Sequence, residues 1–350
     1  MSVSYRQEWI KNVQGCKDDA QGSPVVDTLP SWCNRRANVS SAPMLSVATL
    51  RGVRTIITHD ECPDGVASAV LLHDALPGAA VQFMQHGTDA HRNIAPRAGL
   101  LFCDFSPLPD RAADFARAGT IVLDHHRTAK EVVRMMGDRG VFGDERADPG
   151  VSGAVLAHRH VWVTIQGDSP LREFAEHFAT VAGVRDTWQT HSHLWTEGRA
   201  QAELLLAFPQ AWWLGRSLSQ IASSWTDKLA PLGDALVAKQ DDRVRRAVAD
   251  GHRFVAGGTS VFVISGTSLT SDAMRLLSAK ADVLAGFDFS EERARPKMHV
   301  SLRSEGIFDC AAFALRHGGG GHTHAAGFTV TLEPGAPQPY TLIERIFQER

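Results

Sequence analysis

The sequence predicts an α/β protein, with a doubly wound parallel sheet domain followed by a smaller α/β domain that contains a mixed sheet. Three observations support this fold class. Short apolar runs alternate with helical stretches over residues 53–207, a segment rich in tryptophan and proline interrupts the pattern at 208–232, and a second strand-and-helix pattern follows. Because strands that alternate with helices form parallel sheets, helices are expected on both faces of the first sheet.

Residues 49–207 are predicted to form the first domain. Residues 1–48 lack a clear period and contain several prolines, so a poorly ordered extension is expected there. Strands are expected at Val53–Thr58, Ala79–Met84, Leu100–Asp104 and Thr120–Leu123. Helices are expected at Val66–Leu76, Asp110–Ala118, Gly153–Val163, Leu171–Val184 and Glu197–Leu206. Ser106 is expected to cap the second of these helices.

Residues 208–232 are predicted to connect the domains through a partly helical segment, with Trp212 and Trp213 packed between the domains. Residues 233–350 are predicted to form the second domain. Its helices are expected at Gly233–Gly251, Ser271–Ser278, Cys310–Arg316 and near the C-terminus. Its strands are expected at Ser260–Ile264, Val283–Phe289, Lys297–Arg303 and Ala326–Leu332.

Composition restricts the classes of function. A formal net charge of -3 argues against a general nucleic-acid coat protein, although it allows a short phosphate substrate. The five cysteines are scattered and form no CxxC pair, which favours a reducing cytoplasm over a disulfide framework or a structural zinc site. No apolar run approaches the ~18 residues that span a bilayer, and no signal peptide is recognisable. A cytoplasmic protein without a membrane partner is therefore expected.

Acidic and histidine side chains are placed at four points where predicted strands stop. These are His59-Asp60-Glu61-Cys62-Pro63-Asp64, Asp104, Asp124-His125-His126 and Asp186. Ligands collect at the carboxyl ends of strands in open α/β sheets, so these groups should converge. Carboxylates with imidazoles suit Mn²⁺, Fe²⁺, Zn²⁺ or Mg²⁺, and their number predicts a two-metal site for phosphoryl displacement. A single aspartate after a strand is more often a helix cap, so the hypothesis depends on the joint occurrence.

The second domain contains four consecutive glycines before His322, and Arg303 stands at the end of a predicted strand. Glycines allow positive φ angles and can turn backbone N–H groups inward to bind an anion. A guanidinium can grip a phosphate with two hydrogen bonds. The alternatives are a flexible turn for the glycines and an arginine at the rim for Arg303.

Two motifs together resemble the DHH phosphoesterase superfamily, in the branch with a DHH-associated C-terminal domain. They are Asp124-His125-His126 with Thr128-Ala129, and Gly318-Gly319-Gly320-Gly321-His322 with Ala325-Ala326-Gly327-Phe328. The resemblance covers about residues 53–335. Members of this superfamily include RecJ-like exonucleases, nanoRNases, phosphatases of 3′,5′-bisphosphonucleotides and cyclic-dinucleotide hydrolases.

The resemblance implies a role for each matching residue. Asp64, Asp104, His125 and Asp186 are implied to be metal ligands, with Asp104 bridging two ions, and His59 is implied to serve the other metal. His126 would face the substrate phosphate, and Asp124 would orient the histidine pair. The substrate's other phosphate or terminal nucleotide would be bound by Arg303, Gly320, Gly321 and His322.

The sequence departs from many members of the superfamily at Cys62, where they have an aspartate two residues before the one that matches Asp64. A related group carries His-x-x-Cys-x-Asp-Gly, and His59, Cys62, Asp64 and Gly65 fit it. Three alternatives follow: Cys62 is a metal ligand, Asp60 takes that place, or one metal is held weakly.

The expected function is therefore that of a phosphoesterase that hydrolyses short oligonucleotides or small phosphorylated nucleotides with a metal-bound hydroxide. Two Mn²⁺ ions are expected, with Mg²⁺, Fe²⁺ or Co²⁺ as alternatives, and a homodimer is considered. A polyphosphate or 3′,5′-bisphosphonucleotide phosphatase is the alternative activity, and a non-catalytic nucleotide- or RNA-binding protein is the alternative of another class. The histidine pairs at His158 and His160 and at His191 and His193 are expected on exposed faces rather than at a metal.

Overall fold

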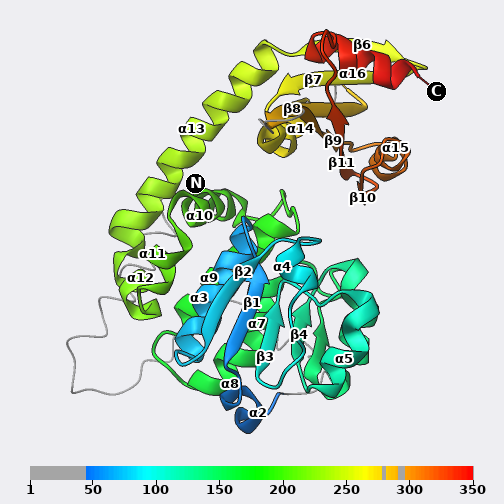
Figure 1. Cartoon of the computed structure of the whole chain (residues 1–350). Helices are drawn as coiled ribbons and strands as arrows, with labels where there is room; N and C mark the ends of the chain where they lie inside the picture. The colour runs from blue at the N-terminus through cyan, green and yellow to red at the C-terminus, as the bar shows by residue number, and fades with distance from the viewer. Residues whose placement is uncertain (1–44, 278–280, 291–295, 350) are drawn as a thin grey trace. The chain divides into compact units, whose positions relative to one another are not determined.

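The computed structural model describes residues 45–277, 281–290 and 296–349, without the side chain of His322 (Figure 1). The extension predicted at 1–48 therefore lies almost entirely outside the described residues. Its last residues begin helix α2 (Val47–Arg51), where the Ser46 side chain accepts a hydrogen bond from the backbone N–H of Thr49. Within the described ranges, no helix is both long enough and apolar enough to cross a membrane.

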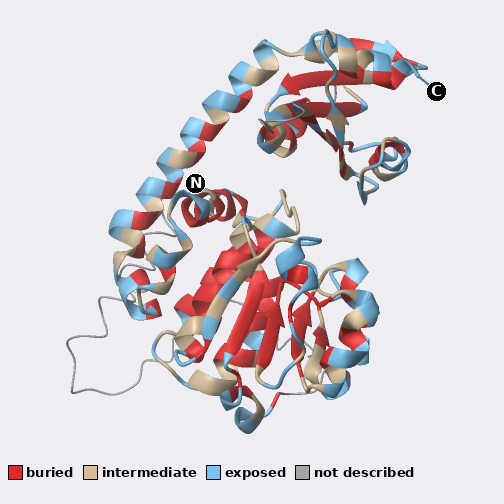
Figure 2. Ribbon diagram, viewed as in Figure 1, coloured by how far each residue is buried: buried red, intermediate tan, exposed pale blue. Residues whose placement is uncertain are grey.

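The first domain is built on a five-stranded parallel sheet with the strand order β2-β1-β3-β4-β5 (Figure 1). The strands are β1 (Thr55–His59), β2 (Ala80–Met84), β3 (Leu100–Cys103), β4 (Ile121–Asp124) and β5 (Gly140–Phe142). The residues of β3 and β4 are all buried (Figure 2), as expected for parallel strands covered on both faces. The order reverses between β1 and β3, where doubly wound folds bind their ligands. The sequence does not predict β5, which is only three residues long.

Helices cover both faces of this sheet. On one face, α3 (Pro63–Ala75) packs with α7 (Gly153–Ala157) and α9 (Arg172–Asp186). On the other face, α5 (Ala112–Arg117) and α6 (Lys130–Met135) pack through an apolar cluster with the strands. Ten of the residues of α3 are buried, which explains why its sequence is small and apolar on every side. Shorter elements are α4 (Asp89–Arg92) and the 3₁₀ turns Pro109–Arg111, Arg127–Ala129 and Gly137–Arg139.

The sequence predictions for Ser106 and His158 are wrong. Ser106 does not cap the following helix, because its hydroxyl donates a hydrogen bond of 2.5 Å to Oδ2 of Asp124, and Leu108 instead precedes the first helical turn. His158 is not exposed, since it is buried and its ring stacks on Trp162 at a centroid distance of 5.7 Å. It begins a π-helical turn, His158–Trp162, which joins α7 to α8 (Val163–Gln166).

The connector is helical along most of its length. It follows α10 (Trp195–Ala207) and contains α11 (Gln210–Leu214), α12 (Leu218–Ser224) and the π-helical turn Trp225–Leu229, which runs into α13 (Ala230–Ala249). Trp213 is fully buried and donates a hydrogen bond from Nε1 to the carbonyl oxygen of Leu205 in α10. Trp225 packs edge-on against Phe174 and Phe178 of α9. Trp213 and Trp225 therefore anchor the connector to the first domain.

The second domain contains a six-stranded mixed sheet with the order β10-β11-β9-β8-β7-β6, in which only β7 and β8 are parallel. Its strands are β6 (His252–Ala256), β7 (Thr259–Ser265), β8 (Val283–Ser290), β9 (Lys297–Arg303), β10 (Gly320–His322) and β11 (Ala325–Thr331). Its helical elements are the 3₁₀ turn Thr267–Leu269, α14 (Thr270–Leu277), α15 (Cys310–Arg316) and α16 (Pro339–Gln348). Alternate residues of β7 face two apolar clusters, one with α15 and α16 and the other with α13 and α14. The sequence does not predict β6 and treats β10 as a glycine-rich turn.

Candidate metal centre

The predicted site residues of the first domain converge at the carboxyl edge of its sheet. β1 ends at His59, Asp104 directly follows β3, and β4 ends at Asp124. Asp64 comes from the first turn of α3, which begins four residues after β1. The sequence analysis expected Asp186 at the end of a strand, and this is wrong. Asp186 is the last residue of helix α9, which packs against α3.

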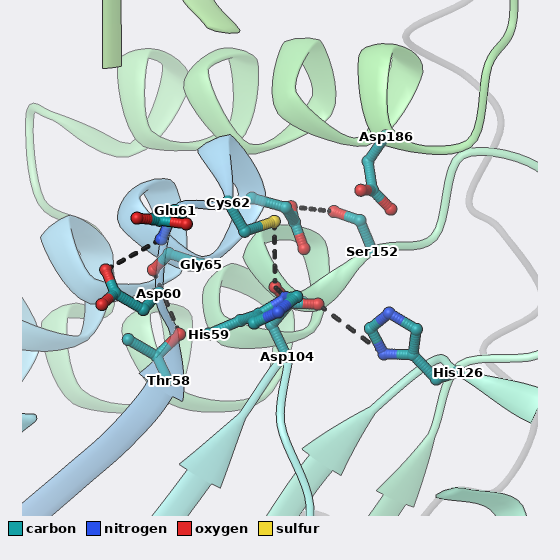
Figure 3. Close-up of polar contacts among 12 residues, drawn as sticks. Thr58, His59, Asp60, Glu61, Cys62, Gly65, Asp104, His126, Ser152 and Asp186 are labelled. Carbon is teal, nitrogen blue, oxygen red and sulfur yellow. Dashed lines mark hydrogen bonds and ion pairs between the residues drawn. The ribbon is translucent and has the colours of Figure 1, made fainter. Parts of the chain in front are cut away.

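Asp104 lies at the centre of this group and is 1 % exposed. Its Oδ1 is 3.1 Å from Nε2 of His125 and 3.9 Å from Nδ1 of His126. Its Oδ2 is 3.6 Å from Sγ of Cys62 and 3.9 Å from Nδ1 of His59. Figure 3 shows the cysteine sulfur and the histidine rings directed toward this carboxylate. Asp104 thus has one oxygen in each of two groups of ligand atoms, as a bridging carboxylate would.

A third group of ligand atoms consists of Asp64, His125 and Asp186. Oδ2 of Asp186 is 3.5 Å from Nε2 of His125. Asp64 is held in place because its Oδ1 accepts hydrogen bonds from the Ser152 hydroxyl at 2.6 Å and from the backbone N–H of Ala154 at 3.2 Å. In each of the three groups, the candidate ligand atoms lie within 4.8 Å of one another.

The histidine pair is oriented by Asp124, which is 1 % exposed. Oδ1 of Asp124 accepts hydrogen bonds from the backbone N–H of His126 at 3.0 Å and from its Nδ1 at 2.8 Å. Oδ2 of Asp124 accepts a hydrogen bond from the hydroxyl of Ser106. Asp124 itself belongs to none of the three ligand groups, so its carboxylate acts by fixing the ring of His126.

The backbone around the site is strained and closely packed. Within the described ranges, three residues other than glycine have positive φ angles, and they are Glu61, Asp104 and Trp188. All three stand beside or among the candidate ligands, where strain is often concentrated in functional sites. Gly153 at the start of α7 has no room for a side chain, because a Cβ there would lie 2.4 Å from Cβ of Asp104 and 2.8 Å from Oδ2 of Asp64.

Burial and mutual repulsion make the negative charges of the site unfavourable. Burial and the neighbouring Asp64 raise the pKa of Asp104 to about 8 and that of Asp186 to about 6. Burial opposes a charge on His125, but its hydrogen bond to Asp104 and the charge of Asp186 outweigh this and raise its pKa to about 10. Burial likewise opposes a charge on His126, yet Asp124 raises its pKa to about 9. The carboxylates therefore require positive charge close by.

The residues present fit a divalent cation. Oδ2 of Asp64 and Nδ1 of His59 are buried and have no hydrogen-bond partner among the described residues. An unpartnered buried polar atom is costly, and a cation would satisfy both atoms. Carboxylate oxygens and imidazole nitrogens are ligands that Mn²⁺, Fe²⁺ and related ions accept.

The sequence analysis left Cys62 and Asp60 as alternatives for the metal ligand that is an aspartate in many DHH phosphoesterases. In the structure, only Cys62 lies near the other candidate ligand atoms. Cys62 forms a group with His59 and Asp104, whereas Asp60 belongs to none of the groups found among the described residues. Oδ1 of Asp60 accepts a hydrogen bond from the backbone N–H of Glu61 at 2.8 Å and another from the side chain of Gln210. Asp60 thus links the loop after β1 to the connector.

The predicted phosphate-binding residues of the second domain lie on neighbouring strands. Arg303 is opposite Ala325, and His322 is paired with Ala325 across β10 and β11. Arg303 donates from Nε to Ser271 at 3.0 Å and from Nη1 to Ser301 at 3.1 Å. The last two glycines of the run form β10 with His322 rather than an open loop, although Gly321 keeps a φ of 140°.

Several residues at the site are not identified by the sequence reasoning. Ser152 and Gly153 position Asp64 and Asp104, and a Ser-Gly pair before an apolar helix could have indicated an N-cap, which Ser152 is. His86 lies beyond β2, and its ring is 4.9 Å from that of His59. Its position just after a predicted strand could have indicated it, as it did for the acidic and histidine clusters after the other strands.

Comparison with known proteins identifies similar folds. No family model and no curated protein matches the sequence. Among solved structures, the pGpG-specific phosphodiesterase PggH from Vibrio cholerae matches 84 % of this chain and 98 % of its own, at 12 % identity and a TM-score of 0.50. An uncharacterized protein from Helicobacter pylori G27 matches 85 % of this chain and 98 % of its own, at 14 % identity and a TM-score of 0.39. The chain therefore shares the fold of PggH.

The close approach of Gly153 to two ligand candidates leads to a test that alters no ligand. Gly153→Ala adds one methyl group, which must displace Asp104 or Asp64. We expect the affinity for Mn²⁺, measured by titration calorimetry on folded protein, to fall by about 10- to 100-fold, as for other changes around metal ligands. Gly78→Ala is the matched control, since a Cβ at Gly78 meets nothing within 4 Å. Equal Mn²⁺ affinity in both variants would contradict the assignment of Asp64 and Asp104 to a metal centre.

Proposed function

We propose that this chain is a metal-dependent phosphodiesterase that hydrolyses short oligonucleotides or small nucleotides, and that it is related to the DHH phosphoesterases. The observation that carries the proposal is the position of Asp104, whose two oxygens each face a separate group of ligand atoms. Two ions that act on one phosphate must lie close together, and a carboxylate with one oxygen toward each ion can hold them in that position. A protein that only bound nucleotides would have no need for this arrangement.

The residues that would hold the ions are those of the three groups apart from His126, which we assign to the substrate. His59, Cys62 and Asp104 would form one site, and Asp64, His125, Asp186 and Asp104 the other. Bound ions would supply a nucleophilic hydroxide at neutral pH and would stabilise the charge that develops on the phosphate. The chain's own contribution is to fix these ligands through Ser152, Ala154 and the tight contact at Gly153.

His126 would bind the substrate phosphate. Asp124 fixes Nδ1 of its ring and raises its pKa to about 9, which favours the charged form of the ring, with a proton on Nε2 as well. A charged N–H donor toward a phosphate oxygen makes a stronger hydrogen bond than a neutral one. This arrangement would orient the phosphate for attack and stabilise negative charge in the transition state.

The proposed substrate class rests on two supports. The fold is that of PggH, which is a phosphodiesterase specific for pGpG. The second domain contains Arg303, which is partly buried and uses Nε and Nη1 for hydrogen bonds, whereas Nη2 has no partner in the described part of the chain. We infer that Arg303, with the backbone of Gly320 and Gly321 and with His322, binds the distal phosphate of a short substrate.

Asp104→Asn tests the bridging role. The amide keeps the shape of the side chain but offers one oxygen and no charge, so we expect Mn²⁺-dependent hydrolysis of pGpG and of bis(p-nitrophenyl) phosphate to fall by at least about 100-fold. The measurement is kcat with each substrate, in parallel with Mg²⁺, Fe²⁺ and Co²⁺. Asp110→Asn, at an exposed acid of the same domain, should leave kcat unchanged. Full activity of Asp104→Asn would show that the metal centre is wrongly assigned.

Cys62 is proposed as a ligand on the basis of its 3.6 Å distance from Asp104, and this role has a spectroscopic test. A cysteine ligates metals as the thiolate, and Co²⁺–thiolate bonds absorb in the near ultraviolet through charge transfer. We expect this band in the Co²⁺-loaded protein, and we expect Cys62→Ser to lose it while Cys310→Ser, in the second domain, retains it. If the band is missing from the unsubstituted protein, Cys62 is not a ligand.

Arg303→Ala tests the recognition of the distal phosphate. A charge-assisted hydrogen bond contributes about 1.5–3 kcal/mol, so we expect KM for pGpG to rise by about 10- to 150-fold with little change in kcat. Hydrolysis of bis(p-nitrophenyl) phosphate, which has no second phosphate, should keep its rate. Arg345→Ala, at an exposed arginine of the same domain, is the control. Unchanged KM for pGpG would remove Arg303 from the substrate site.

A further inference from the structure

We propose that His86 is a further substrate-binding residue of this site, and that its imidazole donates a hydrogen bond to a phosphate oxygen of the substrate. The inference builds on the proposed function, because it assigns a second phosphate contact beside His126. It concerns a histidine outside the three groups of candidate metal ligands.

His86 reaches the site from the edge strand of the parallel sheet. β2 pairs with β1 in parallel, with Met84 beside His59, so His86 stands two residues beyond the level of His59 at the same carboxyl edge. Its ring meets the ring of His59 edge-on at 4.9 Å and lies 6.3 Å from the ring of His126. His86 is therefore beside the candidate metal centre, next to His59 and near the His126 that we assign to the phosphate.

The ring of His86 has a fixed orientation although the residue is exposed. It stacks on Phe105 with a centroid distance of 4.2 Å and an interplanar angle of 28°. Phe105 is fully buried and directly follows Asp104 in the chain. The stack thus connects His86 rigidly to the residue at the centre of the metal groups.

The backbone around His86 is also held on both sides. Before it, Gln85 donates a hydrogen bond from its side chain to the carbonyl oxygen of Asp60 at 2.9 Å. After it, the backbone N–H of Gly87 donates to Nδ1 of His91 at 3.2 Å, and Nε2 of His91 is 3.0 Å from the carbonyl oxygen of Ser106. The buried His91 therefore anchors the turn that presents His86.

The nitrogens of His86 remain available for a ligand. The described residues provide no hydrogen-bond partner for them, whereas the rings of His91, His125 and His126 each have at least one. Among the described residues, no group of three ligand atoms within 4.8 Å of one another includes His86, so we assign its ring to the substrate and not to a metal. The imidazole N–H of His86, which is held in place near His126, can donate a hydrogen bond to an anionic oxygen of the substrate phosphate.

Two substitutions of His86 separate hydrogen bonding from stacking. His86→Phe keeps a ring on Phe105 and loses the donor, whereas His86→Gln keeps a donor and loses the ring. We expect His86→Phe to raise KM for pGpG about 10-fold, the effect of one lost hydrogen bond of about 1.4 kcal/mol, and His86→Gln to stay within about 3-fold of the unsubstituted protein. Mn²⁺ affinity should be the same in both. His252→Phe, at an exposed histidine of β6, is the control.

The opposite pattern, with normal KM in His86→Phe and a raised KM in His86→Gln, would show that the ring stacks a base and would overturn the proposal. Loss of Mn²⁺ affinity in both variants would make His86 a metal ligand instead, which also overturns it. Equal KM in all variants would remove His86 from the substrate site.

Binding of inorganic phosphate to the Mn²⁺-loaded protein, followed by calorimetry, keeps this test separate from the proposed function. If the unsubstituted protein hydrolyses neither pGpG nor bis(p-nitrophenyl) phosphate, the proposed function fails. The role of His86 is then still decided by whether His86→Phe weakens phosphate binding about 10-fold and His86→Gln does not. Equal phosphate affinity in both variants would reject the role.

Discussion

Repulsion between buried carboxylates is the constraint on which the rest of the first domain depends. Asp64, Asp104 and Asp186 all face the ring of His125 or one another, and two of them are almost fully buried. Such charges destabilise a fold unless positive charge and fixed donors surround them. Several local features meet this constraint. The hydroxyl of Ser152 donates to Asp64, α7 begins at a glycine where a side chain would collide with Asp104 and Asp64, and Nε2 of His125 lies 3.1 Å from Asp104 and 3.5 Å from Asp186.

The elements that carry strong patterns could be predicted from the sequence. β1, β3 and β4 are short apolar runs followed by acids or histidines, and they are buried on both faces, so pattern and position agree. β5 and β6 could not be predicted in this way. β5 has three residues, and exposed residues alternate with buried ones over only part of β6.

The positions of single side chains depended on tertiary contacts that a sequence pattern does not contain. Ser106 stands before a predicted helix and resembles an N-cap, but the buried Asp124 from a distant part of the chain takes its hydroxyl. Asp186 is brought to the sheet edge by the packing of α9 on α3, not by a strand. His86 follows a half-exposed edge strand, whose burial pattern gives little indication that its end lies beside His59 and His126.

The three ligand groups draw residues from His59 to Asp186, which is most of the first domain. An unfolded chain cannot hold such distant groups around one ion. An ion bound there would therefore bind only the folded state and would stabilise it. At a metal concentration 100 times Kd, mass action would add about 2.7 kcal/mol to the stability of this domain. The supply of metal would then govern how long the protein persists, as well as how fast it works.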